Sequence, residues 1–122
     1  MVTSTDDDSP RPEGWAISKA HALQLIGSFS EQVSEGVKLW DKHHDPRMLR
    51  LAIATALMAH RMVEKWTDLN PSEAVLAPLG TLYSVVNEVR QTALQGVPLL
   101  QEYVQIDWQP YAEAAKRHYS RT

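Results

Sequence analysis

Apolar residues recur at intervals of three and four along most of this chain, the repeat of an α-helix with one buried face. No segment alternates apolar and polar residues over a useful length, and β-branched residues are sparse, so we expect no strand. The fold class is therefore predicted to be all-α. The clearest example of the repeat is the series Val75, Leu79, Leu82, Val86, Val89 and Ala93.

The ends of the first two helices can be predicted from their flanking residues. We expect the first helix to run from Ile17 to His43. Asp45 is a good N-cap, and Pro46 at the first helical position forfeits no hydrogen bond. The second helix is expected to run from there to Asp68.

The rest of the chain carries similar signals. The segment from Asn70 to Glu73 reads Asn-Pro-Ser-Glu, which predicts an Asn cap, a first-turn proline and a capping box for a third helix. Gly96, followed by Val-Pro, predicts the end of that helix. Residues 99–108 then favour a short helix, and Pro110 begins another. We expect a single-domain bundle of four main helices, the last of which is broken into two short ones.

Composition separates a tail from one folded domain. The 122 residues are 43% hydrophobic and 22% charged, as in an ordinary globular protein. Residues 1–14 hold four of the 15 acids and one of the 12 Lys and Arg residues, so the net charge of −3 belongs to this segment. We expect a flexible acidic tail over residues 1–14 and a helical bundle domain over residues 15–122, docked at Trp15 and Ile17.

Several chemistries are excluded by what the sequence lacks. There is no cysteine, hence no disulfide, iron–sulfur cluster or thiol catalysis, and we expect a cytoplasmic protein. The nucleotide-binding glycine motifs, the nucleophile elbow, His-Glu-x-x-His and the di-iron pattern are all missing. Glu31 and Glu35 are assigned to solvated surface. We expect a non-catalytic protein with no cofactor and no metal.

The histidines allow two interpretations. His60 and Glu64 are four residues apart and could share a metal, but His60 lies on the apolar face of its helix, which favours a core histidine bonded to a neighbour. His43 and His44, followed by Asp45, could bind a metal in a loop. The alternative is that they close a helix C-terminus, where the dipole favours positive charge.

A basic stripe on the second helix is the feature that indicates a partner. At ~100° per residue its four side chains fall within roughly 60° of the helix circumference, and no acid lies among them. Such a stripe is often only a solvated surface, yet it also suits a nucleic-acid backbone or another subunit. The four bases are Arg47, Arg50, Arg61 and Lys65. The residues between them on this face are Leu51, Ala54, Met58 and Met62.

The stripe would be longer if the last helix packed beside the second, because that helix carries further bases. They are Lys116, Arg117 and Arg121.

Over residues 15–122, this cysteine-free helical chain with four bases on one helix resembles the small helical subunits of CRISPR effector complexes. The resemblance implies a non-catalytic subunit of a nucleoprotein assembly, with Arg47, Arg50, Arg61 and Lys65 contacting the RNA or DNA backbone. The alternative is a protein–protein interaction module, a homodimer or an adaptor, that uses the same Met and Arg face. Neither hypothesis involves a membrane, because no apolar run approaches the length of a membrane-spanning helix.

Overall fold

The computed structural model describes residues 17–66 and 68–120, and within these ranges the chain is helical, without strands. The all-α prediction is therefore confirmed, and the segment after Gly96 forms two separate helices. The predicted tail and Trp15 lie outside the described residues. The five helices of the described residues are α1 (Lys19–His43), α2 (Pro46–Lys65), α3 (Glu73–Val89), α4 (Pro98–Val104) and α5 (Gln109–Ser120).

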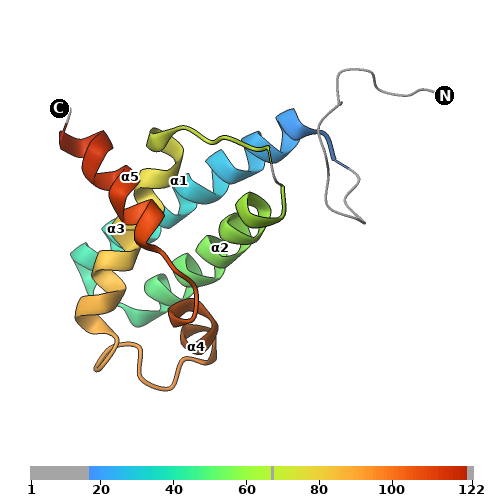
Figure 1. Cartoon of the computed structure of the whole chain (residues 1–122). Helices are drawn as coiled ribbons and strands as arrows, with labels where there is room; N and C mark the ends of the chain where they lie inside the picture. Colours follow the sequence, from blue (N-terminus) through green and yellow to red (C-terminus); the bar gives the residue numbers. More distant parts are fainter. Residues whose placement is uncertain (1–16, 67, 121–122) are drawn as a thin grey trace.

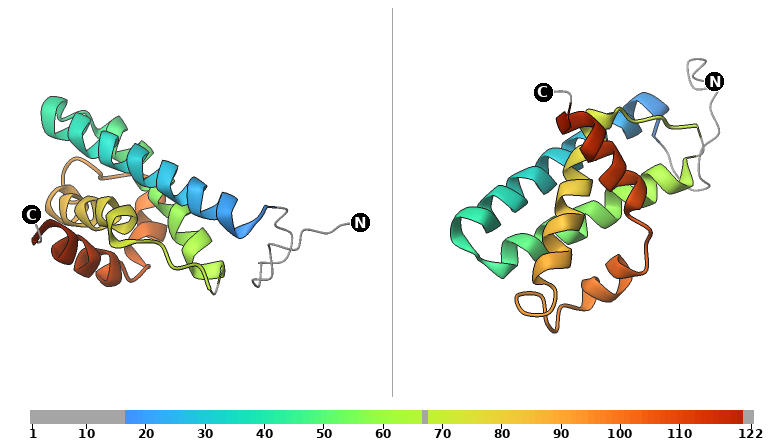
Figure 2. Two further views of the ribbon diagram at one scale, coloured as in Figure 1. Left: turned by 90° about the horizontal axis from the view of Figure 1, so that it is seen from above. Right: turned by 60° about the vertical axis from the view of Figure 1, so that its left-hand side comes forward.

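The first two helices form an antiparallel hairpin on which the rest of the fold is built (Figure 1). Helix α3 packs against both α1 and α2, and the short α4 contacts α2. Helix α5 lies on α3, so that α3 is sandwiched between the hairpin and α5 (Figure 2). The side of the hairpin that faces away from α3 is left uncovered by the other described helices.

The helix starts depend on side-chain caps. Asp45 caps α2 as predicted, because its carboxylate accepts a hydrogen bond of 3.0 Å from the Arg47 backbone N–H. The prediction that Asn70 caps α3 is wrong. Ser72 is the N-cap and accepts from the backbone N–H of Val75, whereas the Asn70 amide donates back to the carbonyl of Asp68. Asn70 and Ser72 are similarly good N-cap residues by type, so their identities alone did not decide which of them caps α3.

Two other helix ends differ from the prediction. Helix α2 ends at Lys65, before the expected Asp68, and α3 ends at Val89, well before Gly96. Residues 90–96 form turns in which Leu94 is fully buried, so the chain leaves the helix to place this side chain in the core. Gly96 then adopts φ +82°, a left-handed conformation that glycine enters at little cost.

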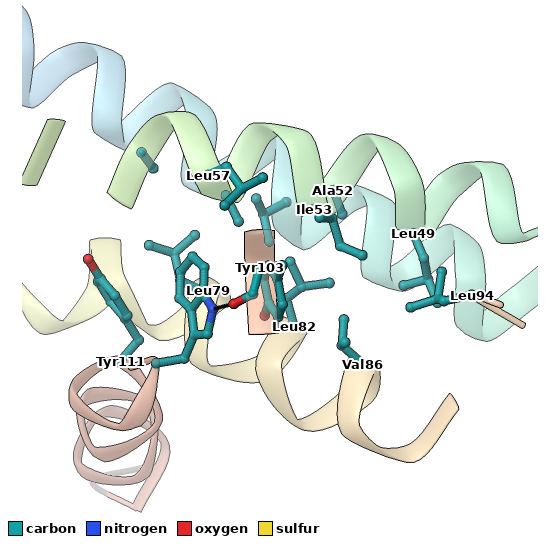
Figure 3. Packing of buried hydrophobic residues seen from close by; sticks show 14 residues of the cluster. Leu49, Ala52, Ile53, Leu57, Leu79, Leu82, Val86, Leu94, Tyr103 and Tyr111 are labelled. Carbon is teal, nitrogen blue, oxygen red and sulfur yellow. Dashed lines mark hydrogen bonds between the residues drawn. The ribbon is translucent and has the colours of Figure 1, made fainter. Parts of the chain in front are cut away.

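The larger apolar cluster lies between the hairpin and α3, and it is closed by α4 and the start of α5. Figure 3 shows Leu49, Ile53 and Leu57 of α2 pointing toward the apolar side chains of α3. Trp108 stacks on Tyr103 at a ring-centroid distance of 4.4 Å and donates its indole N–H to the Tyr103 carbonyl at 2.7 Å. This contact fixes the segment between α4 and α5 against the core.

Glycine permits one close approach within the hairpin. A Cβ at Gly36 would lie 3.1 Å from the Cβ of Ala52 and 3.2 Å from the Met48 carbonyl oxygen, so α1 and α2 are close here. Gly27 of the same helix permits no such approach, because an added Cβ there meets nothing within 4 Å. None of the helices in the described part of the chain has the length and apolarity needed to cross a membrane.

Candidate functional site

The uncovered side of the hairpin, which we call the outer face, carries the two most accessible apolar side chains of α2. Leu51 is 63% exposed and Met58 is 43% exposed. They are seven residues apart, about two helical turns, and so lie on one line along the helix. Gln32 and Leu39 of α1 have the same spacing and border the groove between the two helices. These four residues, with Glu35 and Arg61, define the outer face.

Two hollows lie in this groove. The first, the Leu51 hollow, has a volume of about 240 Å³ and lies between Glu35 and Leu39 of α1 and Leu51 of α2. The second, the Met58 hollow, measures about 310 Å³ and is lined by Ile17, Phe29, Met58, Arg61 and Met62. The outer face is therefore a groove with two depressions, each of which is mainly apolar and has one charged side chain in its wall.

All four bases of the predicted stripe are exposed, but two of them are ion-paired. Arg47 binds Asp45 through two guanidinium nitrogens, with Nη2 at 2.8 Å and Nε at 3.1 Å from the carboxylate oxygens. Arg61 forms a salt bridge with Glu102 of α4. Hydrogen bonds from Arg47 hold the pKa of the Asp45 carboxyl below its usual range. Half of the stripe is thus neutralised by acids that lie outside α2.

The remaining two bases, Arg50 and Lys65, have no ion pair among the residues that the structure describes. They lie fifteen positions apart on one helix, which at 1.5 Å per residue is about 22 Å. The stripe thus presents two well-separated unpaired positive charges and not the continuous row of four that the sequence predicts.

The last helix does not extend the stripe, because the condition for it is not met. Helix α5 lies on α3 and not beside α2. Arg117 accordingly forms a salt bridge with Glu73 in the first turn of α3, and Lys116 borders a hollow between α3 and α5. Arg121 lies outside the described residues.

Met62 is also placed differently from the prediction. It was expected to be exposed between the bases of the stripe, but it is only 7% exposed and packs with Ala22, Ile26 and Trp66. The reason is that Met62 lies on the side of α2 nearest α1, where the first helix covers it. Met58 and Leu51 lie further round α2 and remain accessible.

His60 is confirmed as a packed core-facing histidine bonded to a neighbour. Its Nδ1 is 2.8 Å from the hydroxyl of Tyr111, and its ring lies 5.2 Å from that of Trp108. Its Nε2 is 3.8 Å from the Glu64 carboxylate. Desolvation lowers the pKa of His60, although the charge of Glu64 acts in the opposite direction. Burial also raises the pKa of Tyr111, to about 12.

His44 ends α1, as the helix-closing interpretation predicts. It adopts φ 54° at the C-cap, its backbone N–H donates to the Trp40 carbonyl, and its ring lies 4.9 Å from that of Trp40. Over residues 17–66 and 68–120, no three His, Asp or Glu side chains come together in a way that could hold a metal ion.

The sequence did not indicate the α1 side of the outer face, and Glu35 was expected to lie on solvated surface. The spacing of Gln32 and Leu39, which matches that of Leu51 and Met58, was the available signal. It becomes meaningful only once α1 and α2 are known to lie side by side.

No protein-family model, curated protein or solved structure matches this chain. The resemblance to small subunits of CRISPR complexes therefore stays a prediction from sequence.

Proposed function

We propose that this chain is a non-catalytic protein–protein interaction module, which binds an apolar protein surface on its outer face. The observation that carries the proposal is the exposure of Leu51 and Met58 in one line beside two apolar hollows. Single exposed apolar residues are ordinary on protein surfaces, but aligned ones beside a groove form a patch of the kind found at interfaces.

The charges around the patch support a protein partner better than a nucleic acid. Arg47 and Arg61 are paired with carboxylates, so they offer less attraction to phosphate than free cations would. Glu35, in the wall of the Leu51 hollow, would repel a phosphate backbone. Methionine and arginine are, by contrast, enriched at protein interfaces, and covering a leucine side chain contributes roughly 1.5–3 kcal/mol.

Contact with a nucleic-acid backbone is a second proposal, and it now rests on Arg50 and Lys65 alone, both exposed. We also propose a cytoplasmic location, which the absence of cysteine favours.

Photo-crosslinking tests the interface. Benzoylphenylalanine placed at Leu51 should give a discrete adduct in cells that produce the protein, while the same residue at Gln95, an exposed turn position, should not. Mass spectrometry would identify the adduct, and Met58→Glu should abolish binding between the two purified proteins. Equal labelling from both positions, or binding that Met58→Glu leaves intact, would contradict the proposal.

A further inference from the structure

A small hollow away from the outer face collects several polar side chains. It has a volume of about 120 Å³ and lies where the second half of α3 meets α4 and the turn that leads into α5. Trp108 and Tyr103, whose rings stack, form part of its wall. The polar side chains of this hollow, which we call the Tyr103 hollow, are Tyr83, Asn87, Arg90, Tyr103 and Asp107.

The Tyr103 hydroxyl lacks a hydrogen-bond partner. The residue is 1% exposed, and its hydroxyl oxygen is buried without a partner among the described residues. Such a group has lost its hydrogen bonds to water and has gained none in exchange, which is uncommon in folded proteins. Burial raises the pKa of Tyr103 well above its usual range, and so does Tyr83 in the same wall, so the hydroxyl keeps its proton at neutral pH. It is therefore a donor that a ligand in the hollow can satisfy.

Further donors come from one face of the chain at the end of α3. Tyr83, Asn87 and Arg90 follow one another at intervals of four and three residues, the spacing that aligns side chains along a helix. None of these three side chains makes a hydrogen bond or an ion pair with another of the described residues. Each of them can donate an O–H or N–H to a ligand that carries acceptor oxygens. The hollow is thus rich in donors that the protein itself does not use.

Arg90 and Asp107 place opposite charges in the wall of this hollow without pairing. No ion pair joins them in the described part of the chain. One Asp107 carboxylate oxygen accepts a hydrogen bond of 3.0 Å from the Gln109 backbone N–H, and the carboxylate has room for further donors. A ligand carboxylate would bind the planar guanidinium of Arg90 through two parallel hydrogen bonds. An ammonium group on the same ligand would bind Asp107.

We propose that the Tyr103 hollow binds a small α-amino acid, with its carboxylate at Arg90 and the Tyr103 hydroxyl and its ammonium group at Asp107. This site goes beyond the proposed function, because it shares no residue with the outer face. A water molecule occupies about 30 Å³ in the liquid, so a hollow of about 120 Å³ has room for about four waters, which suits an amino acid as small as glycine or alanine. A doubly charged anion such as phosphate is disfavoured, because Asp107 would repel it.

An NMR titration of the purified, ¹⁵N-labelled full-length chain with L-alanine, up to millimolar concentrations, tests the site. We expect the backbone amide signals of residues 83–90 and 103–109 to shift along one saturable curve, while those of α1 stay in place. The absence of saturable shifts, or shifts spread evenly over the chain, would overturn the inference.

Two substitutions test the carboxylate end of the ligand. Tyr103→Phe should weaken alanine binding about tenfold, because the lost hydroxyl donates to a charged group. The fold should be unchanged, since this hydroxyl has no partner among the described residues, and circular dichroism checks it. Arg90→Gln should also weaken binding about tenfold or more, and Arg50→Gln, at an exposed arginine of α2, is the matched control. Unchanged affinity in a folded Tyr103→Phe or Arg90→Gln variant would overturn the assignment.

Ligand analogues test whether both charges are recognised. Propionate is alanine without its ammonium group and ethylamine is alanine without its carboxylate, so each should bind about tenfold more weakly than alanine. Asp107→Asn keeps a side-chain oxygen for the Gln109 N–H but removes the charge, and it should weaken alanine while leaving propionate as tight or tighter. Propionate or phosphate that binds the unaltered chain as tightly as alanine would overturn the amino-acid assignment.

Discussion

Gly80 of α3 lies directly against the backbone of Tyr111 in α5: a Cβ at position 80 would be 2.3 Å from the Tyr111 carbonyl oxygen and 2.9 Å from the Cα of Ala112. The two helices therefore meet through backbone atoms at this point. Because Tyr111 also bonds His60 of α2, the close approach sets the position of a side chain that links α5 to the hairpin.

Gly80→Ala should destabilise the fold, although alanine is the better helix former. The added methyl group meets backbone that cannot rotate away, so we expect the free energy of unfolding to fall by about 2 kcal/mol. Gly27→Ala is the matched control, because nothing lies within 4 Å of the added Cβ and the helix should gain up to about 1 kcal/mol. Urea denaturation followed by circular dichroism measures both. Equal effects of the two substitutions would contradict the close approach.

Two tyrosine-to-phenylalanine substitutions should have opposite consequences. Tyr111→Phe removes the hydroxyl that lies 2.8 Å from His60 and should cost about 1 kcal/mol. The hydroxyl of Tyr103 is buried and has no hydrogen-bond partner among the described residues, and burial raises the pKa of Tyr103 well above its usual range. Tyr103→Phe should therefore be neutral or stabilising. A loss from Tyr103→Phe as large as that from Tyr111→Phe would show that the Tyr103 hydroxyl is bonded.

Stability should depend on pH through His60. Its pKa in the folded state lies below the ordinary value of about 6.5, so the unfolded chain takes up a proton first as the pH falls. The free energy of unfolding should decrease as the pH falls from about 6.5 to below the lowered pKa of His60. At still lower pH His60 is protonated in both states, and its contribution should no longer change with pH. His60→Gln should remove this component from a profile of melting temperature against pH. Parallel profiles for the two proteins would show that His60 does not contribute.

Nucleic-acid binding, if present, should show a shallow salt dependence. Each phosphate contacted by a base on a single strand contributes about −0.7 to the slope of log K against log salt, so two unpaired bases predict about −1.4. Fluorescence anisotropy of a labelled single-stranded RNA measures the slope, and Arg50→Glu should abolish the binding while Arg47→Glu changes it little. A slope near −3 would indicate that the ion pairs of Arg47 and Arg61 open on binding.

The segments that form helices could be predicted from the sequence, because helix formation depends on local periodicity and local caps. The three-and-four spacing in α2 places Leu49 and Ile53 on the buried face, where the structure has them, and Asp45 with Pro46 marks the start of that helix. The same reasoning put His60 on an apolar face and predicted a bonded core histidine. Each of these properties is determined by residues within one or two helical turns of one another.

The partners of those residues were decided by tertiary structure alone. Arg61 pairs with Glu102, 41 positions away, and His60 bonds Tyr111, 51 positions away. Helical periodicity says which side of a helix is buried but not which helix covers it, so it could not show that α5 lies on α3 or that α1 covers Met62. The charge left on the basic stripe and the groove beside Leu51 both follow from that packing order, because each is formed by side chains from two helices.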